Sequence, residues 1–276
     1  MDRIKKAKLA KIAVLGVLVA ILALTLFPGA VSAETKSSPS TDHQSIAINN
    51  GIINIYEFGE TYSDGWLYRG EDQVYFERPA MSYGANQPVY LDEEGVVIHR
   101  YPEYGVPNRW YWAKSLLDLN GDGRPDVVVN RGIRVPSGAK FCYVRYEIQS
   151  LRGVLCNFRF FEGVDYDAAG SSGHDEAGYD VAGDYVWGHD TVVGTWVGFK
   201  AYTMSAHHSV ASYGDMWNQV RTGVLNDSPY YAGDIGVAME WDSLALYHYK
   251  AITLKFAFAD SSDELNYLLT RTPWLP

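Results

Sequence analysis

The chain has 276 residues, with 33 Asp and Glu against 23 Lys and Arg, so its formal net charge is −10 at pH 7. Binding to a nucleic-acid backbone needs a basic surface, and this excess of acid argues against nucleic acid as a partner. No proline- or serine-rich linker interrupts the chain after residue 44, which indicates one large domain.

The N-terminal segment has the three regions of a secretory signal peptide. Basic residues are concentrated in 1–11, an uncharged apolar run covers 12–27, and small residues end at Ala33. This order predicts cleavage after Ala33 and a protein that is secreted or held at the cell surface. The alternative is an uncleaved membrane anchor, and no later segment is apolar enough to span a bilayer. Residues 34–44 are polar and turn-rich, which predicts a flexible tether.

Short runs rich in β-branched and aromatic residues recur along the rest of the chain. Gly, Asn, Asp and Pro separate them, as in antiparallel sheets with tight turns. The runs cover 45–56, 73–76, 88–91, 95–99, 126–130, 141–149, 154–161, 185–187, 195–203, 236–241 and 251–259. Helical periodicity is limited to 215–225 and 261–269. The pattern predicts an all-β fold, a large antiparallel β-sandwich over 45–276 with one or two short helices.

Residues 118–126 have the sequence DLNGDGRPD, which places side-chain oxygens at positions 1, 3, 5 and 9 of a loop. Hard oxygen donors at this spacing suit a calcium ion. The loop resembles the calcium loops of FG-GAP repeats and of dockerins, which share the pattern DxNxDGxxD. It predicts a metal site, with calcium as cofactor, built from Asp118, Asn120, Asp122, the carbonyl of Arg124, and Asp126. The alternative is an Asx-rich turn without a metal.

The two cysteines fall on neighbouring predicted strands. Cys142 lies in the run at 141–149 and Cys156 in the run at 154–161, with a short turn between them. A hairpin would bring the two side chains opposite each other, and an exported protein meets oxidising conditions. The sequence therefore predicts a disulfide, with two buried thiols as the alternative.

A second acidic tract covers residues 162–190 and contains no Lys or Arg. Asp165, Asp167, Asp175 and Glu176 within it could bind a second calcium ion or form a pair of catalytic carboxylates. The alternative is a solvated loop. The histidine pair at 207–208 is interpreted as polar structure, because a zinc site needs three or four converging ligands.

Aromatic residues are concentrated in the first half of the chain. Trp66, Trp110 and Trp112 are candidates for contact with sugar rings, since they combine flat apolar faces with polar neighbours. The alternative is that these residues fill the core or a subunit interface.

Two longer segments carry a family resemblance. The segment 142–179, with FFEGVDYDAAG, and the segment 232–269, with AGDIGVAMEWD, are similar to the β-supersandwich domain of glucodextranases and prokaryotic glucoamylases. The resemblance implies a large sandwich in a secreted protein that faces polysaccharide. The catalytic barrel that follows this domain in those enzymes has no counterpart here, so the resemblance does not imply hydrolysis.

These observations favour a secreted, calcium-binding, non-catalytic module that binds a glycan or another cell-surface component. One alternative is a structural subunit of a surface layer or filament, whose copies associate through residues 34–44. Another is a carbohydrate-active enzyme that uses carboxylates within 162–190. The common catalytic motifs are absent from the sequence, so an enzyme is the less favoured class. The expected partners are a glycan, a surface polymer or copies of the chain itself.

Overall fold

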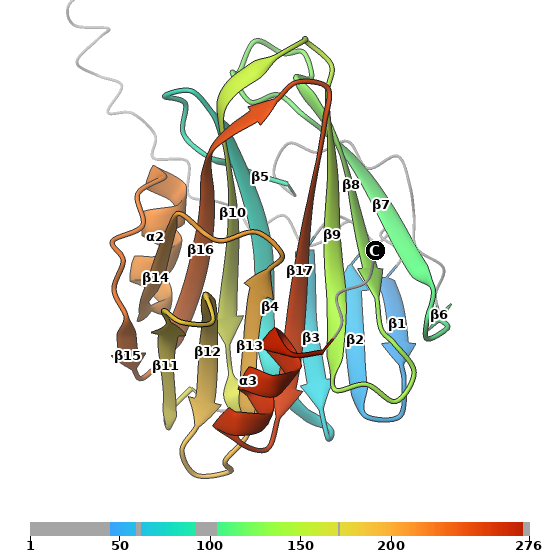
Figure 1. The fold of residues 1–276 in the computed structure, drawn as a ribbon, viewed down its shortest axis with the longest axis vertical. Coiled ribbons are helices and arrows are strands. Elements are labelled where there is room, and N and C mark those ends of the chain that lie inside the picture. The colour runs from blue at the N-terminus through green and yellow to red at the C-terminus, as the bar shows by residue number, and fades with distance from the viewer. Residues whose placement is uncertain (1–44, 59–61, 92–103, 171, 273–276) are drawn as a thin grey trace, which may run out of the picture. The chain divides into compact units, whose positions relative to one another are not determined.

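The computed structural model describes residues 45–58, 62–91, 104–170 and 172–272. The predicted signal peptide, tether and strand at 95–99 lie outside these residues. The described chain forms two sheets that pack face to face, with one helix against the outer face of each (Figure 1). The all-β sandwich expected from the sequence is confirmed. None of the helices in the described part is long and apolar enough to cross a membrane.

Sheet A has nine strands, and neighbouring strands are antiparallel except for one pair, β1 with β6. In spatial order it contains β14 (His207–Ser212), β16 (Ile235–Leu246), β10 (Leu155–Tyr166), β4 (Glu71–Tyr83), β3 (Tyr62–Tyr68), β2 (Ile53–Phe58), β1 (Ser45–Asn49) and β6 (Tyr104–Gly105), and β5 (Val89–Tyr90) pairs with β4. The helix α2 (Tyr213–Thr222) contacts β14, β16 and β10 on the outer face of this sheet.

Sheet B has eight antiparallel strands. In spatial order these are β15 (Tyr230–Ala232), β11 (Asp175–Asp180), β12 (Tyr185–Asp190), β13 (Trp196–Ala201), β17 (Tyr249–Ala259), β9 (Phe141–Ser150), β8 (Val127–Arg134) and β7 (Trp110–Leu117). The helix α3 (Ser262–Thr270) packs on β17 and β13 through three leucines, Leu265, Leu268 and Leu269. The helix falls in the segment 261–269, where the sequence showed helical periodicity. Ser261 caps the helix, and its hydroxyl accepts a hydrogen bond from the N–H of Glu264.

The facing sides of the two sheets form the main hydrophobic core, because alternate residues of each strand point inward. Aromatic side chains dominate its centre. The ring of Phe256 lies 4.6 Å from that of Trp66 and 4.8 Å from that of Phe199. Trp66 has no exposed surface, so the prediction that it contacts a ligand is wrong and the core alternative holds for it.

A charged group lies within this core. The guanidinium of Arg131 is 2.7 Å from a carboxylate oxygen of Glu77, and both side chains are fully buried. The hydroxyl of Tyr146 lies 2.8 Å from Glu77 and 3.3 Å from Glu162. Burial and the nearby charge of Glu77 raise the pKa of Glu162 well above its ordinary value. The single cation thus stabilises two buried carboxyl groups, one of which has a strong tendency to stay protonated.

Two interpretations of the sequence are corrected by the structure. The run at 45–56 is a hairpin of two strands, because Asn50 and Gly51 form a turn in which Gly51 has φ of +89°. An Asn-Gly pair favours such tight turns because it tolerates positive φ. The acidic tract at 162–190 is not a solvated loop, since it contains the end of β10 together with β11 and β12.

The predicted disulfide is wrong. Cys142 is the second residue of β9, whereas Cys156 is the second residue of β10, which begins after β9 has ended at Ser150. Eight residues of extended chain separate Cys142 from Ser150, which corresponds to about 26 Å. In addition, β9 and β10 belong to different sheets, so the turn between them is a crossover rather than a hairpin.

Candidate functional site

The loop at 118–126 connects β7 to β8 and has the compact form expected of its sequence. The carboxylate of Asp118 accepts hydrogen bonds from four backbone N–H groups of residues 120–123. Asp126, which is buried, accepts a bond from the N–H of Leu119. Although desolvation opposes the change, these backbone donors hold the pKa of Asp118 below its ordinary value.

An arginine from the neighbouring β9–β10 connection reaches into this loop. The guanidinium of Arg152 lies 2.9 and 3.0 Å from the two oxygens of Asp122 and 2.8 Å from the carbonyl of Arg124. It is also 3.4 Å from Asp126. Arg152 thus contacts three of the five predicted calcium ligands. The calcium site at this loop remains a prediction, and an ion there has to compete with this guanidinium.

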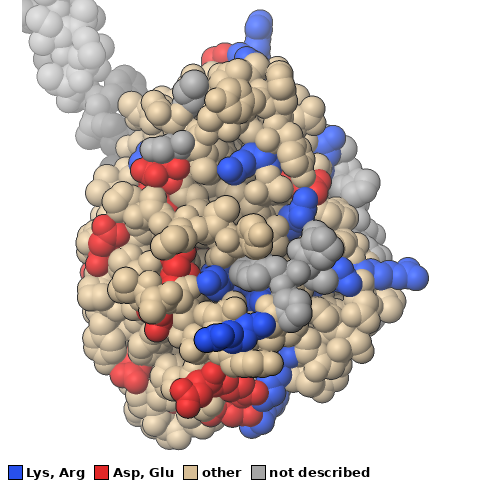
Figure 2. Space-filling model, viewed as in Figure 1, with Lys and Arg blue, Asp and Glu red and all other residues tan. Residues whose placement is uncertain are grey.

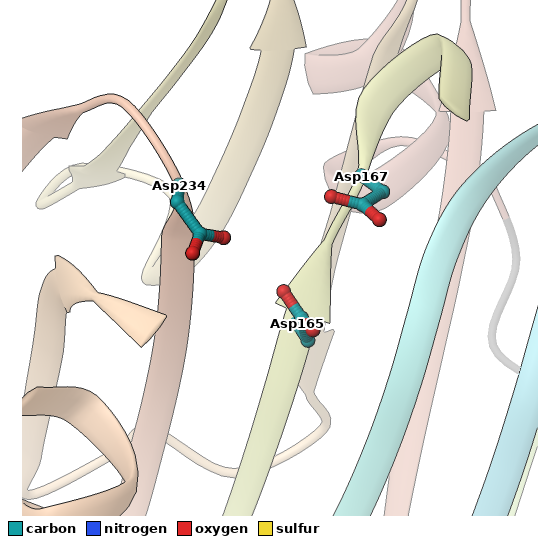
Figure 3. A group of neighbouring side chains, drawn as sticks. All are labelled: Asp165, Asp167 and Asp234. Carbon is teal, nitrogen blue, oxygen red and sulfur yellow. The ribbon is translucent and has the colours of Figure 1, made fainter. Parts of the chain in front are cut away.

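A second acidic group lies where β10 ends and β16 begins. Asp165, Asp167 and Asp234 each offer a carboxylate oxygen, and these oxygens lie within 4.8 Å of one another. In Figure 3 the three carboxylates point toward a common space. We call these three residues the aspartate cluster. Of the residues predicted for a second acidic site, Asp165 and Asp167 belong to it, and the cluster could hold a metal ion.

The aspartate cluster follows from strand geometry. Asp165 pairs with Gly236 across β10 and β16, so Asp234, two residues before Gly236, is a diagonal neighbour on the same face. Asp167 follows Asp165 at a spacing of two, which returns a side chain to the same side of an extended chain. Burial, with the charges of Asp167 and Asp234 as smaller contributions, raises the pKa of Asp165 to about 8.

The two other residues of the predicted acidic site point in opposite directions. Asp175 is buried, and burial together with the charge of Asp190 opposite it raises its pKa to about 8. Glu176 lies on the other face of β11, 3.1 Å from the ring of His189 and 2.8 Å from the hydroxyl of Tyr230. The four predicted carboxylates therefore do not form one site.

A further polar group, which the sequence did not identify, crosses the outer face of sheet A. His207 on β14 and Glu240 on β16 are directly opposite each other in the pairing register. Both lie on the side of the sheet that faces α2, since Ala211 and Ala238 on the same strands pack against that helix at even spacing from them. Arg159 on β10 lies 3.6 Å from the Glu240 carboxylate. We call His207, Glu240 and Arg159 the outer-face group.

Each member of the outer-face group has a defined environment. Asp227 lies 3.0 Å from Nδ1 of His207, and this contact raises the pKa of the imidazole. Burial raises the pKa of Glu240, whose side chain is only 4% exposed. Arg159 donates to Ser82 and to the carbonyl of Gly223 at the end of α2. The result is an exposed proton donor beside a shielded carboxyl group.

His208 belongs to a different environment from His207, because successive strand residues face opposite sides. Its ring stacks on Tyr179 of sheet B with the centroids 3.6 Å apart, and burial lowers its pKa. The interpretation of the His pair as polar structure thus fits His208 and overlooks His207. The missing information was the strand pairing of β14 with β16, which no local motif encodes.

The two remaining candidate aromatics lie on the edge strand β7. Trp110 and Trp112 stack with ring centroids 5.3 Å apart, and both are partly exposed. They remain a predicted contact for a sugar ring.

The charged side chains are unevenly distributed on the face seen in Figure 2. Asp and Glu lie along the left, where Figure 1 places α2 and β14, and at the bottom, while Lys and Arg lie mostly in the centre and on the right.

No protein-family model matches the chain. Its fold is similar to that of a bacterial glucoamylase in complex with acarbose, with a TM-score of 0.61 and 8% identity over 78% of this chain and 31% of the glucoamylase. This chain therefore spans less than a third of that enzyme. A GalM/aldose epimerase homologue from C. elegans matches with a TM-score of 0.55 and 6% identity, over 80% of this chain and 100% of the homologue. An Escherichia coli K12 protein described as a candidate aldose 1-epimerase matches with a TM-score of 0.52 and 6% identity, over 79% and 99%.

These similarities confirm the resemblance to the glucoamylase sandwich domain at the level of the fold. They contradict the expectation of a non-catalytic module and the related expectation that the chain is not an enzyme, because the proteins matched along 99–100% of their length are a candidate aldose 1-epimerase and a homologue of aldose epimerases. Identity this low establishes the fold and assigns no role to any residue. The fold is that of a β-sandwich found in carbohydrate-active enzymes.

Proposed function

We propose that this protein is a carbohydrate-active enzyme that interconverts the anomers of an aldose by acid–base catalysis on the outer face of sheet A. The observation that carries the proposal is the direct pairing of His207 with Glu240, one exposed and bonded to Asp227, the other shielded beside Arg159. The similarity in fold to aldose epimerases supports the choice of reaction.

The reaction needs one proton acceptor and one proton donor. In a cyclic aldose, the acceptor removes the proton of the anomeric hydroxyl while the donor protonates the ring oxygen, and the bond between the anomeric carbon and the ring oxygen breaks. Rotation of the resulting aldehyde and reversal of the proton transfers give the other anomer. Groups whose pKa values lie near neutrality perform such transfers best.

The outer-face group suits these two roles. The raised pKa of His207 favours the protonated imidazole at neutral pH, which makes it the donor to the ring oxygen. The raised pKa of Glu240 makes its carboxylate a stronger base than an ordinary glutamate, which makes it the acceptor. Arg159 acts as a positioning residue, because its bonds to Ser82 and Gly223 hold its charge beside the Glu240 carboxylate.

The proposal is tested by polarimetry on freshly dissolved α-D-glucose and α-D-galactose, with the spontaneous rate subtracted. We expect the protein to accelerate the change in rotation, and we expect Glu240→Gln and His207→Gln each to reduce that acceleration by about 10²- to 10⁴-fold, the usual loss when a general acid or base is removed. Asp263→Asn, in the first turn of α3, is the matched control and should leave the rate unchanged. An unaccelerated rate with both sugars, or full activity in Glu240→Gln, would contradict the proposal.

We also propose calcium as the ion of the protein and the cell exterior as its location. The spacing of oxygen donors in 118–126 supports the first proposal, and the order of basic, apolar and small residues in 1–33 supports the second. A sugar or a sugar polymer is then the partner that fits both the proposed reaction and the proposed location.

A further inference from the structure

The aspartate cluster lies away from the outer-face group, although both are on sheet A. Asp165 is opposite Gly236 on β16, and Glu240 follows Gly236 by four residues, so the two places are about 13 Å apart along the strand. The cluster therefore has no contact with the proposed reacting atoms. Its chemistry needs a separate explanation.

The spacing of the three carboxylates fits one small cation. Calcium is bound by oxygens at about 2.3–2.6 Å, so two oxygens on the same ion are separated by no more than about 5 Å. The oxygens of Asp165, Asp167 and Asp234 lie within 4.8 Å of one another. The three oxygens are therefore close enough together to share a single ion.

The burial of Asp165 is an independent indication of a ligand. The residue is only 5% exposed, and its Oδ1 has no hydrogen-bond partner among the described residues. A buried polar atom without a partner costs about 1–3 kcal/mol, which is why such atoms are rare in folded proteins. The carboxylate points into the space that it shares with Asp167 and Asp234 (Figure 3). A cation in that space would supply the missing partner.

Charge balance leads to the same conclusion. Within the described part of the chain, no Lys or Arg forms an ion pair with any of the three aspartates. Asp72 adds to the negative potential at Asp165, and Asp165 in turn adds to that at the buried Asp175. Carboxylates at this separation repel each other strongly in a low-dielectric environment unless a cation is present.

We propose that Asp165, Asp167 and Asp234 form a binding site for a hard divalent cation of the calcium class. The ligands are all oxygens, which favours calcium, magnesium or manganese over zinc. Asp234 is exposed, so water can complete the coordination shell on that side. Because the backbone carbonyl of Asp234 also accepts the N–H of Tyr213, the ion links the end of β10 to the start of β16 and to the first turn of α2.

The site is tested by isothermal titration of the metal-free full chain with CaCl2 and, separately, with MgCl2, together with thermal melts in calcium and in chelator. We expect calcium to bind and to raise the melting temperature. Asp234→Asn, at an exposed position, and Asp165→Asn should each weaken calcium binding at the cluster at least tenfold and reduce the shift in melting temperature. Asp122→Asn in the 118–126 loop and Asp263→Asn on α3 are matched controls, and the binding assigned to the cluster should survive both.

The two sets of variants distinguish a calcium site at the aspartate cluster from one at the 118–126 loop. Calcium binding that is unchanged in Asp165→Asn and Asp234→Asn would overturn the site, as would binding that is lost only in Asp122→Asn. If Asp165→Asn does not fold, Asp234→Asn decides, since its side chain makes no contribution to the core. The result is independent of the proposed reaction, because neither variant belongs to the outer-face group.

Discussion

The loop at 118–126 and the aspartate cluster are both rich in carboxylates. They differ in whether hydrogen-bond donors and cations lie beside those carboxylates. In the loop, backbone N–H groups surround Asp118, and Arg152 forms a bidentate pair with Asp122 that lowers its pKa. In the cluster, burial and mutual repulsion raise the pKa of Asp165. The loop carboxylates thus have donors or a cation beside them, whereas no Lys or Arg of the described residues forms an ion pair with the cluster. A sequence motif thus identifies carboxylates that could bind a metal ion. Whether those carboxylates need a cation depends on which hydrogen-bond donors and basic side chains the fold places beside them.

The buried pair of Arg131 and Glu77 is a third place where a cation lies beside a carboxylate. Removing that cation should have the largest effect on the free energy of unfolding, because both side chains are fully buried. We expect Arg131→Met to destabilise the protein by about 3–5 kcal/mol, because it removes the cation that lies 2.7 Å from the fully buried Glu77 carboxylate. Urea unfolding at pH 7 measures the change. The matched control is Arg145→Met, which breaks a partly exposed pair with Glu147 and should cost less than about 1 kcal/mol. Equal losses in the two variants would show that burial of the charge does not control its contribution.

The sequence predicted features that depend on neighbouring residues better than features that depend on pairing between distant segments. The all-β class and the helix α3 depend on local periodicity, and the sequence predicted both. The hairpin of β1 and β2 carried a local Asn-Gly signal that the prediction of one long strand overlooked. The pairing of Cys142 with Cys156 failed because the chain crosses between sheets after Ser150, and no nearby residue indicates that crossover.

The candidate sites depend almost entirely on such non-local pairing. Asp165 and Asp167 were recognisable as neighbours, but Asp234 joins them only because β10 pairs with β16. His207 and Glu240 are 33 positions apart in sequence and meet through the pairing of β14 with β16. Arg152 reaches the 118–126 loop from the connection after β9. In each case the individual residue types were visible in the sequence, whereas their combination was not.

The smallest expected effect concerns Arg152 and calcium binding at the 118–126 loop. If calcium binds there, it competes with the Arg152 guanidinium for Asp122 and for the carbonyl of Arg124. We expect Arg152→Ala to tighten calcium binding at the loop by no more than about fivefold, because solvent screens an exposed ion pair and limits its contribution. Titration of Arg152→Ala in an Asp234→Asn background isolates the loop from the cluster. Weaker binding in the double variant would mean that Arg152 organises the loop rather than competing with the ion.

The proton on His207 is the central claim, and the pH dependence of anomer interconversion tests it most directly. The hydrogen bond and charge of Asp227 raise the pKa of His207, so catalysis by the protonated imidazole should persist above pH 6.5 and fall as the pH rises through that pKa. Asp227→Asn removes the charge and leaves at most a weaker hydrogen bond from an amide oxygen. The account therefore predicts that the alkaline limb of the rate profile moves to lower pH while the rate well below pH 6 changes little. An alkaline limb at the same pH in both proteins would contradict the assignment of His207 as the proton donor.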